Sequence, residues 1–184
     1  MHHYIAFLRG INLGRRRPPM AGLRALFVKM KFTDVATYIA SGNVIFASRL
    51  ADSRKVEQTI ETNLQQALGY GVDTFVRTRT EVAAIAAFRP FPKADFENPA
   101  HTVYASFLKD ALRAAQVRQL LACRTEVDDF RVEGREIYWL CRIKSNESNV
   151  WASPAMRAVK LPTMSMRNLT TVRKLATLYP AAAG

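Results

Sequence analysis

The stretch "VATYIASGNVIFAS", residues 35–48, decides how the first half of the chain folds. Two runs rich in β-branched and aromatic residues, "VATYIA" and "NVIFAS", lie around "SGN" at 41–43. Gly and Asn tolerate the backbone geometry of tight turns, and Val, Ile, Tyr and Phe favour strands. The stretch therefore predicts a β-hairpin.

A strand and a helix are predicted on each side of this hairpin. Residues 3–8 form an apolar strand run, and apolar residues recur at helical spacing from Met20, behind Pro18-Pro19. Residues 52–69 predict a second helix that ends at Gly69, and 72–77 a further strand. The order over residues 3–77 is βαββαβ, the order of the ferredoxin-like plait.

The second half repeats this pattern without repeating the sequence. A short helix at 79–88 and a Pro-rich connector lead to a strand at 101–108 and a helix at 110–122. A hairpin turning at Glu133-Gly134, a helical segment from Ser148, a short strand at 161–166 and a closing helix follow. We therefore predict an α+β fold of two ferredoxin-like (βαββαβ) units in one compact chain: residues 1–78, a helix and connector at 79–99, and residues 100–184 with a C-terminal helix.

The strands are apolar on both faces. "YIAFL", "VIF" and "IYWLC" show no alternation of polar and apolar residues, which is typical of sheets covered on both sides. The helices of a plait cover only one face, so we expect the two units to dock over their sheets. RNA-recognition domains instead leave one sheet face open and carry a basic-Gly-aromatic pattern that "GNVIFAS" lacks.

The composition is that of an ordinary globular protein. The longest apolar run, "VAAIAAF" at 82–88, is far shorter than the roughly 20 residues of a membrane span, and the N-terminus does not resemble a signal peptide. We expect a cytoplasmic protein that does not bind membranes. Cys123 and Cys141 are expected to be buried free thiols.

The chain is strongly basic. Its 27 basic and 15 acidic residues give a formal charge of +12, and 19 of the basic residues are Arg, which suits bidentate contact with phosphate. This excess of positive charge favours nucleic acid or a phosphorylated small molecule as the partner. The alternative is that the charge reflects genome composition and solubility.

Three motifs resemble those of the bacterial domain of unknown function family 1697. They are "FLRGINLG" followed by "PM-x-x-L", then "TYIASGNVIF", and finally "MRN" before "T-V-x-K-L". The resemblance runs from about Tyr4 to Tyr179 and implies two plait-like units, but no established activity. Two departures stand out: a triple Arg follows Gly14 where members have a Gly and a Lys-Asn pair, and Leu169 replaces the Trp of Thr-Thr-Arg-Asn-Trp-Asn-Thr.

In a plait, the loop after the first strand and the hairpin emerge at one end of the sheet, which offers Gly amides, Asn donors and guanidinium groups to an anion. The predicted anion- or nucleic-acid-binding residues are Arg9, Asn12, Arg15, Arg16, Arg17, Ser41, Asn43, Arg167 and Asn168. Arg167 and Asn168 lie in the second unit, and we expect them near the other residues only if the two units dock in opposed orientations. Each Asn also has a structural explanation, as a turn residue, a loop residue or a helix cap, and the triple Arg could be a solvated loop.

Other chemistries find little support. Three His and two distant Cys do not form a metal-ligand spacing, no nucleotide-binding or nucleophile motif occurs, and we expect neither metal nor cofactor. His101 is expected to open a strand. The carboxylates of "TEVDD", 125–129, are expected to be solvated or paired with Arg124 and Arg131. Tyr104, Phe107, Tyr138 and Trp139 are expected in the core.

Three functions remain open from the sequence. The first is a non-catalytic protein that binds a phosphate-bearing ligand or nucleic acid backbone through an Arg/Asn/Gly corner. The second is a small-molecule enzyme whose substrate is held between the two units by the group Arg9, Asn12, Asn43, Arg167 and Asn168. The third is an assembly protein whose basic loops bind an acidic partner.

Overall fold

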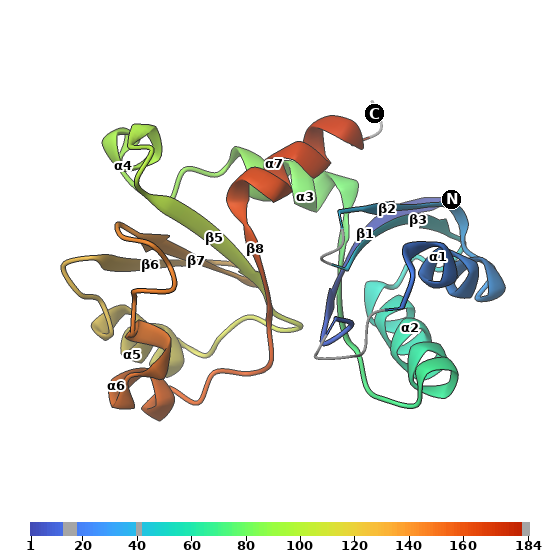
Figure 1. The fold of residues 1–184 in the computed structure, drawn as a ribbon, viewed down its shortest axis with the longest axis horizontal. Helices are drawn as coiled ribbons and strands as arrows, with labels where there is room; N and C mark the ends of the chain where they lie inside the picture. The colour runs from blue at the N-terminus through green and yellow to red at the C-terminus, as the bar shows by residue number, and fades with distance from the viewer. Residues whose placement is uncertain (13–17, 40–41, 182–184) are drawn as a thin grey trace. The chain divides into compact units, whose positions relative to one another are not determined.

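The computed structural model describes residues 1–12, 18–39 and 42–181. The chain divides into two compact units, Met1–Ile85 with Leu175–Gly184, and Ala86–Lys174. Each unit is built on one four-stranded antiparallel sheet with helices packed against it (Figure 1). The predicted fold class, α+β with two ferredoxin-like units, is confirmed.

The first unit follows the predicted βαββαβ order. Its elements are β1 (His2–Arg9), α1 (Met20–Lys29), β2 (Thr33–Tyr38), β3 (Asn43–Ser48), α2 (Ser53–Leu68) and β4 (Asp73–Thr78), and α3 (Arg79–Ala87) follows. The strand order in the sheet is β2-β3-β1-β4, with every neighbouring pair antiparallel. This is the strand order of a plait, in which the first and third strands are central.

Local signals fix the ends of α2. The Asp52 side chain accepts hydrogen bonds from the backbone N–H groups of Arg54 and Lys55, and thereby caps the first turn. At the other end Gly69 has a φ of 76°, a left-handed conformation that Gly adopts without steric cost. The predicted end of this helix at Gly69 is confirmed.

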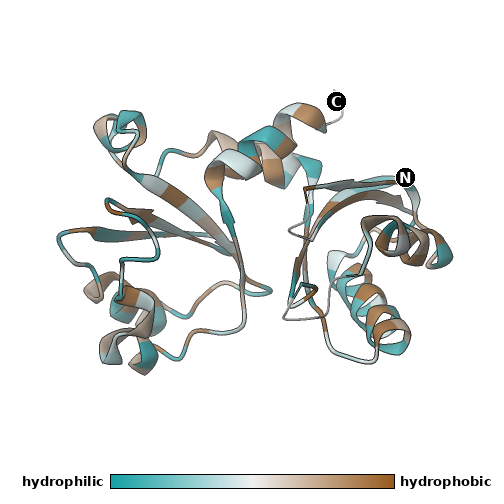
Figure 2. Cartoon of the chain, in the orientation of Figure 1, coloured by the Kyte–Doolittle hydropathy of each residue, from teal (hydrophilic) through white to brown (hydrophobic). Residues whose placement is uncertain are grey.

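The core of the first unit lies between the sheet and the helices α1 and α2. Leu23 and Phe27 of α1, and Val56, Ile60 and Leu64 of α2, are buried against one face of the sheet, and the apolar residues recur along α2 in Figure 2. Consecutive residues 4–8 of β1 are all buried, so the strand is covered on both faces, as its uninterrupted apolar run predicts.

The second unit has the same arrangement. Its elements are α4 (Lys93–Glu97), β5 (Thr102–Phe107), α5 (Ala114–Ala122), β6 (Asp128–Glu133), β7 (Glu136–Cys141), the 3₁₀ helix η1 (Val150–Ala152), α6 (Pro154–Ala158) and β8 (Ser165–Asn168). The helix α7 (Leu169–Leu178) begins in this unit and ends in the first, which includes Leu175 onward. The strand order β6-β7-β5-β8 matches that of the first sheet, strand for strand. The duplication predicted from the element pattern is therefore present in the topology.

Three of the differences from the predicted elements have a clear local cause. The last strand was expected at 161–166 but lies at 165–168, because its pairing with β5 begins at Ser165, beyond Pro162, which has no N–H to donate. The connector 89–99 contains the short helix α4, which starts directly after Pro92. The helix expected from residue 110 begins at Ala114, after a capping interaction between Arg113 and Gln116.

Aromatic rings pack together in the largely aliphatic core of the second unit: Trp139 is buried there, and the partly buried Tyr104 and Trp151 pack against it. The ring of Trp139 stacks on that of Tyr104 at a centroid distance of 4.9 Å and meets that of Trp151 edge-on at 5.5 Å.

Cys123 and Cys141 are buried and free, as predicted. Burial raises the pKa of both thiols above its ordinary value.

In the described part of the chain, no helix has both the length and the apolar character that crossing a membrane requires.

Candidate functional site

The end of β1 and the hairpin between β2 and β3 lie side by side. Phe7 of β1 pairs with Asn43 of β3 in the antiparallel register, and the N–H of Leu8 donates a 2.8 Å hydrogen bond to the carbonyl of Gly42. Gly42 has a φ of 76°, and a Cβ added there would lie 2.8 Å from Cγ2 of Ile11. Ile11, in the described start of the loop that follows β1, therefore packs directly against Gly42 of the hairpin.

The first residue of β4 completes this end of the sheet. Asp73 lies opposite Arg9 in the register of β1 and β4, and its Oδ2 accepts a 3.1 Å hydrogen bond from Nη1 of Arg9. The two side chains are 46% and 54% exposed, so water screens this ion pair. Nε and Nη2 of Arg9 have no hydrogen-bond partner among the described residues. We call Arg9, Asn12, Gly42, Asn43 and Asp73 the β1 corner.

Sequence reasoning missed Asp73. Its position was available as a signal, because the last strand of a plait runs antiparallel to the first and therefore starts at the end of the sheet where the first strand finishes. A second missed residue is Tyr70, whose hydroxyl donates to the carbonyl of Ile11 at 3.4 Å and fixes the start of the loop. Asn12 follows directly and is half-buried.

Two of the predicted asparagines have structural partners. Asn43 is buried, and its Nδ2 donates to the carbonyl of Tyr38 at 3.1 Å, which closes the hairpin from within. The Oδ1 of Asn168 accepts from the N–H and the hydroxyl of Thr170, at 2.9 and 2.7 Å, and caps the start of α7. The structural explanations given for these two residues, as turn residue and helix cap, are confirmed.

Arg167 lies in β8 opposite Ala105, and its Nη1 donates to Oγ of Ser165 and to the carbonyl of Met166 at 2.9 and 2.8 Å. Burial lowers the pKa of Arg167 to about 10, so the guanidinium is still charged at neutral pH. Leu169, which replaces the Trp of the related motif, is buried.

The first unit carries a matching arginine that sequence reasoning did not select. Arg77 lies in β4 opposite Ile5, is 1% exposed, and donates from Nη1 to the carbonyl of Val76 at 2.9 Å. Arg77 and Arg167 thus occupy equivalent positions on the last strand of each sheet, and each bonds to the carbonyl of the residue before it. The short patterns "FVRT" and "SMRN", each directly before a helix, were the available signal.

The structure brings together part of the predicted site. Arg9, Asn12 and Asn43 share the β1 corner, whereas Arg167 and Asn168 belong to the second unit. Four predicted residues, Arg15, Arg16, Arg17 and Ser41, lie outside the described residues.

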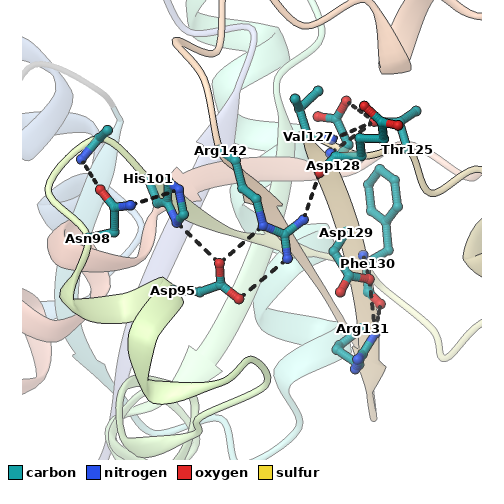
Figure 3. A network of polar contacts seen from close by, with 12 residues as sticks. Asp95, Asn98, His101, Thr125, Val127, Asp128, Asp129, Phe130, Arg131 and Arg142 are labelled. Atoms are coloured by element: carbon teal, nitrogen blue, oxygen red, sulfur yellow. Dashed lines mark hydrogen bonds and ion pairs between the residues drawn. The ribbon is translucent and has the colours of Figure 1, made fainter.

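The side chains of His101 and Asp95 take part in a polar network in the second unit (Figure 3). Nδ1 of His101 lies 3.2 Å from Oδ1 of Asp95, and Nε of Arg142 donates to the same oxygen at 3.1 Å. The other ring nitrogen of His101 lies 3.1 Å from Nδ2 of Asn98. His101 directly precedes β5, as expected, and both of its nitrogens face neighbouring side chains, so the network ties α4 to the sheet.

The three carboxylates of 125–129 differ in their surroundings, and Glu126 is exposed to solvent, as expected. Asp129 forms ion pairs with Arg124 at 2.7 Å and Arg131 at 3.0 Å, which confirms the predicted pairing. Asp128 differs from the expectation, because it is buried: Oδ1 accepts from Nε1 of Trp139 at 2.8 Å, and Oδ2 accepts from the hydroxyl of Thr125. No group of three or more His, Cys, Asp or Glu side chains that could hold a metal ion occurs in the described ranges.

Comparisons with known proteins bear on the fold and the family. A conserved bacterial protein from Streptococcus pneumoniae has a similar structure, with a TM-score of 0.73 and 20% sequence identity, over 97% of this chain and 98% of that protein. No curated protein matches the sequence. The family described as "Protein of unknown function (DUF1697)" matches residues 1–138, three quarters of the chain. The chain therefore belongs to that family.

Proposed function

We propose that the protein binds a phosphate-bearing anion at the β1 corner, either a nucleic acid backbone or a phosphorylated small molecule. The observation that carries the proposal is the hydrogen bond between Leu8 and Gly42, which holds Arg9 beside the hairpin. Arg9 keeps two of its three guanidinium nitrogens available, and planar guanidinium groups bind phosphate oxygens in pairs.

The charge of the chain supports an anionic ligand. Residues 1–85 contain 12 Lys and Arg against 6 Asp and Glu, so the unit that holds the β1 corner has a clear basic excess. Arg15, Arg16 and Arg17 follow Asn12 by three to five residues, a chain span of at most about 18 Å at roughly 3.6 Å per residue. The triple Arg is therefore within reach of a phosphate held at the corner.

The test is fluorescence anisotropy of labelled single- and double-stranded oligonucleotides, with salt raised from about 50 to 200 mM. Binding to the phosphate backbone is expected to weaken steeply with salt and to show little sequence preference. Calorimetric titration with inorganic pyrophosphate forms the second arm. Binding of pyrophosphate without oligonucleotide binding would identify the small phosphorylated ligand class.

Two substitutions at the ion pair should act in opposite directions. Arg9→Gln removes a phosphate ligand and should weaken binding, whereas Asp73→Asn releases Arg9 from its carboxylate and should tighten binding. Both changes affect half-exposed side chains, so neither should impair folding. If Asp73→Asn weakens binding or leaves it unchanged, Arg9 is not the anion ligand.

The triple substitution Arg15→Ala/Arg16→Ala/Arg17→Ala should lower the slope of log K against log salt by up to about three, one for each guanidinium that pairs with a phosphate in the parent protein. A matched control changes three exposed basic residues of the second unit, Arg118→Ala/Arg157→Ala/Lys174→Ala, and alters the net charge equally. If both triple variants weaken binding equally, net charge alone explains the effect and the β1 corner is not the site.

The alternative that the protein is a small-molecule enzyme stays a prediction.

A further inference from the structure

A cavity of about 490 Å³ opens at the other end of the first sheet. It lies where α1 ends, β2 begins and β3 ends, and Thr59 of α2 forms one wall. Pockets that hold small molecules have volumes of roughly 300 to 1,000 Å³, so this one is large enough for a short-chain organic ligand. It belongs wholly to the first unit and contains no residue of the β1 corner.

The wall of the cavity combines positive charge with apolar surface. Lys31 and Arg49 line it, and neither has an acidic partner among the described residues. None of the described residues that line it is acidic. Phe32 and Leu50 line the cavity with apolar surface, and Leu50 is 38% exposed, so its side chain is accessible to a ligand. A ligand with an anionic head and an apolar tail matches both halves of this wall.

The backbone at Lys31 gives a second, independent indication. Lys31 has a φ of 66° and follows Met30, the C-cap residue of α1, at a position where Gly is usual because a Cβ makes the left-handed conformation costly. The N–H of Phe32 bonds to the carbonyl of Phe27, and the rings of these two residues pack at 5.9 Å, which holds the turn in place. The chain therefore keeps a long cation where local stability favours Gly.

The start of β2 is also irregular beside the cavity. The pairing of β2 with β3 shifts between Thr33 and Ala36, and Asp34 within this bulge has a φ of 52°. Bulges redirect side chains and are frequent next to binding sites. The hydroxyl of Thr33, which lines the cavity, has no hydrogen-bond partner in the described part of the chain and can donate to an anion.

We propose that this cavity binds a small amphipathic anion, a carboxylate or phosphate with a short alkyl chain, whose head contacts Lys31, Arg49 and Thr33 and whose tail lies against Phe32 and Leu50. The site is separate from the β1 corner and does not depend on the function proposed there.

The experiment is a ¹H–¹⁵N NMR titration of the full chain with hexanoate and, in parallel, with hexyl phosphate. The amide signals of residues 31–33 and 48–50 are expected to shift, and the tighter of the two anions identifies the head group. Neutral hexanol should bind more weakly than either anion, because it offers no charge to the two cations. Arg9→Gln should leave these shifts unchanged, which separates this site from the β1 corner.

The variant Lys31→Gly/Arg49→Gln should weaken binding by about tenfold or more, equivalent to about 1.4 kcal/mol. Lys31→Gly suits the left-handed backbone, so this variant should fold and its unfolding temperature should not fall. The control Lys29→Gln/Lys55→Gln removes two exposed charges that do not line the cavity and should bind as the parent does. Equal binding of hexanol, equal weakening in both double variants, or no shift at 31–33 and 48–50 would each overturn the proposal.

Discussion

Two glutamates of α2 satisfy backbone amides of the edge strand β4. Oε1 of Glu57 accepts a 2.9 Å hydrogen bond from the N–H of Val76, and Oε1 of Glu61 accepts a 2.8 Å bond from the N–H of Thr74. β4 is the last strand of its sheet, so these N–H groups have no neighbouring strand to pair with. Glu57 is 1% exposed, and its bond to Val76 is therefore shielded from water.

Glu57→Met removes the acceptor at nearly constant side-chain length and leaves the N–H of Val76 buried without a partner. An unsatisfied buried donor costs about 1–3 kcal/mol, and bonds to charged groups lie toward the upper end, so we expect a loss of about 2–3 kcal/mol. For a chain of this size, about 2–4 °C per kcal/mol corresponds to a fall in melting temperature of roughly 4–12 °C. Glu57→Gln keeps a carbonyl oxygen in place and should cost about 1 kcal/mol.

Urea unfolding followed by circular dichroism measures the change in free energy, and amide hydrogen exchange at Val76 reports the bond itself. The half-buried Glu61 provides the comparison, since water can replace more of its bond and Glu61→Met should cost less. A Glu57→Met variant within about 0.5 kcal/mol of the parent would refute the reasoning, because surface substitutions change stability by that much. Equal costs for Met and Gln would show that the carbonyl oxygen is not what matters.

Further predictions concern the turn, the last helix and the thiols. Gly42→Ala should destabilise the fold by about 2 kcal/mol or more in thermal unfolding, because φ is positive and the new Cβ would lie 2.8 Å from Cγ2 of Ile11; an unchanged melting temperature would contradict this. Asn168→Ala should cost about 1 kcal/mol in urea unfolding while Asn168→Asp retains the cap, and equal losses would exclude capping as the cause. Cys123 and Cys141 should react slowly with iodoacetamide at pH 8 and quickly in urea, because burial raises both pKa values; fast reaction in the native state would refute this. Since the folded-state pKa values are raised, the stability these thiols contribute is present at neutral pH and is lost as pH rises through 9.0 and beyond, as pH-dependent urea unfolding should show.

Only part of the candidate site could be predicted from sequence. The meeting of Arg9 with the hairpin follows from the order of strands in a plait, and the roles of Asn43 and Asn168 follow from their local turn and helix signals. The ion pair between Arg9 and Asp73 was not foreseen, because it joins residues 64 positions apart whose side chains meet only through the pairing of β1 with β4. The cavity beside Lys31 was not foreseen either. It is bordered by a left-handed residue and a strand bulge, and neither Lys31 nor the sequence of β2 contains the Gly or Asn that would signal such backbone geometry.

The sequence by itself determined the elements whose signals are local: the hairpin around 41–43, the end of α2 at Gly69, the apolar strands and the two βαββαβ units. These depend on propensity, periodicity and capping within a few residues, so they can be recognised without knowing the fold. Tertiary structure decided the start of β8 at Ser165, the burial of Asp128, the equivalent positions of Arg77 and Arg167, and the use of Glu57 to satisfy β4. Each of these depends on a partner far along the chain, and pairing register and burial exist only once both partners are in place.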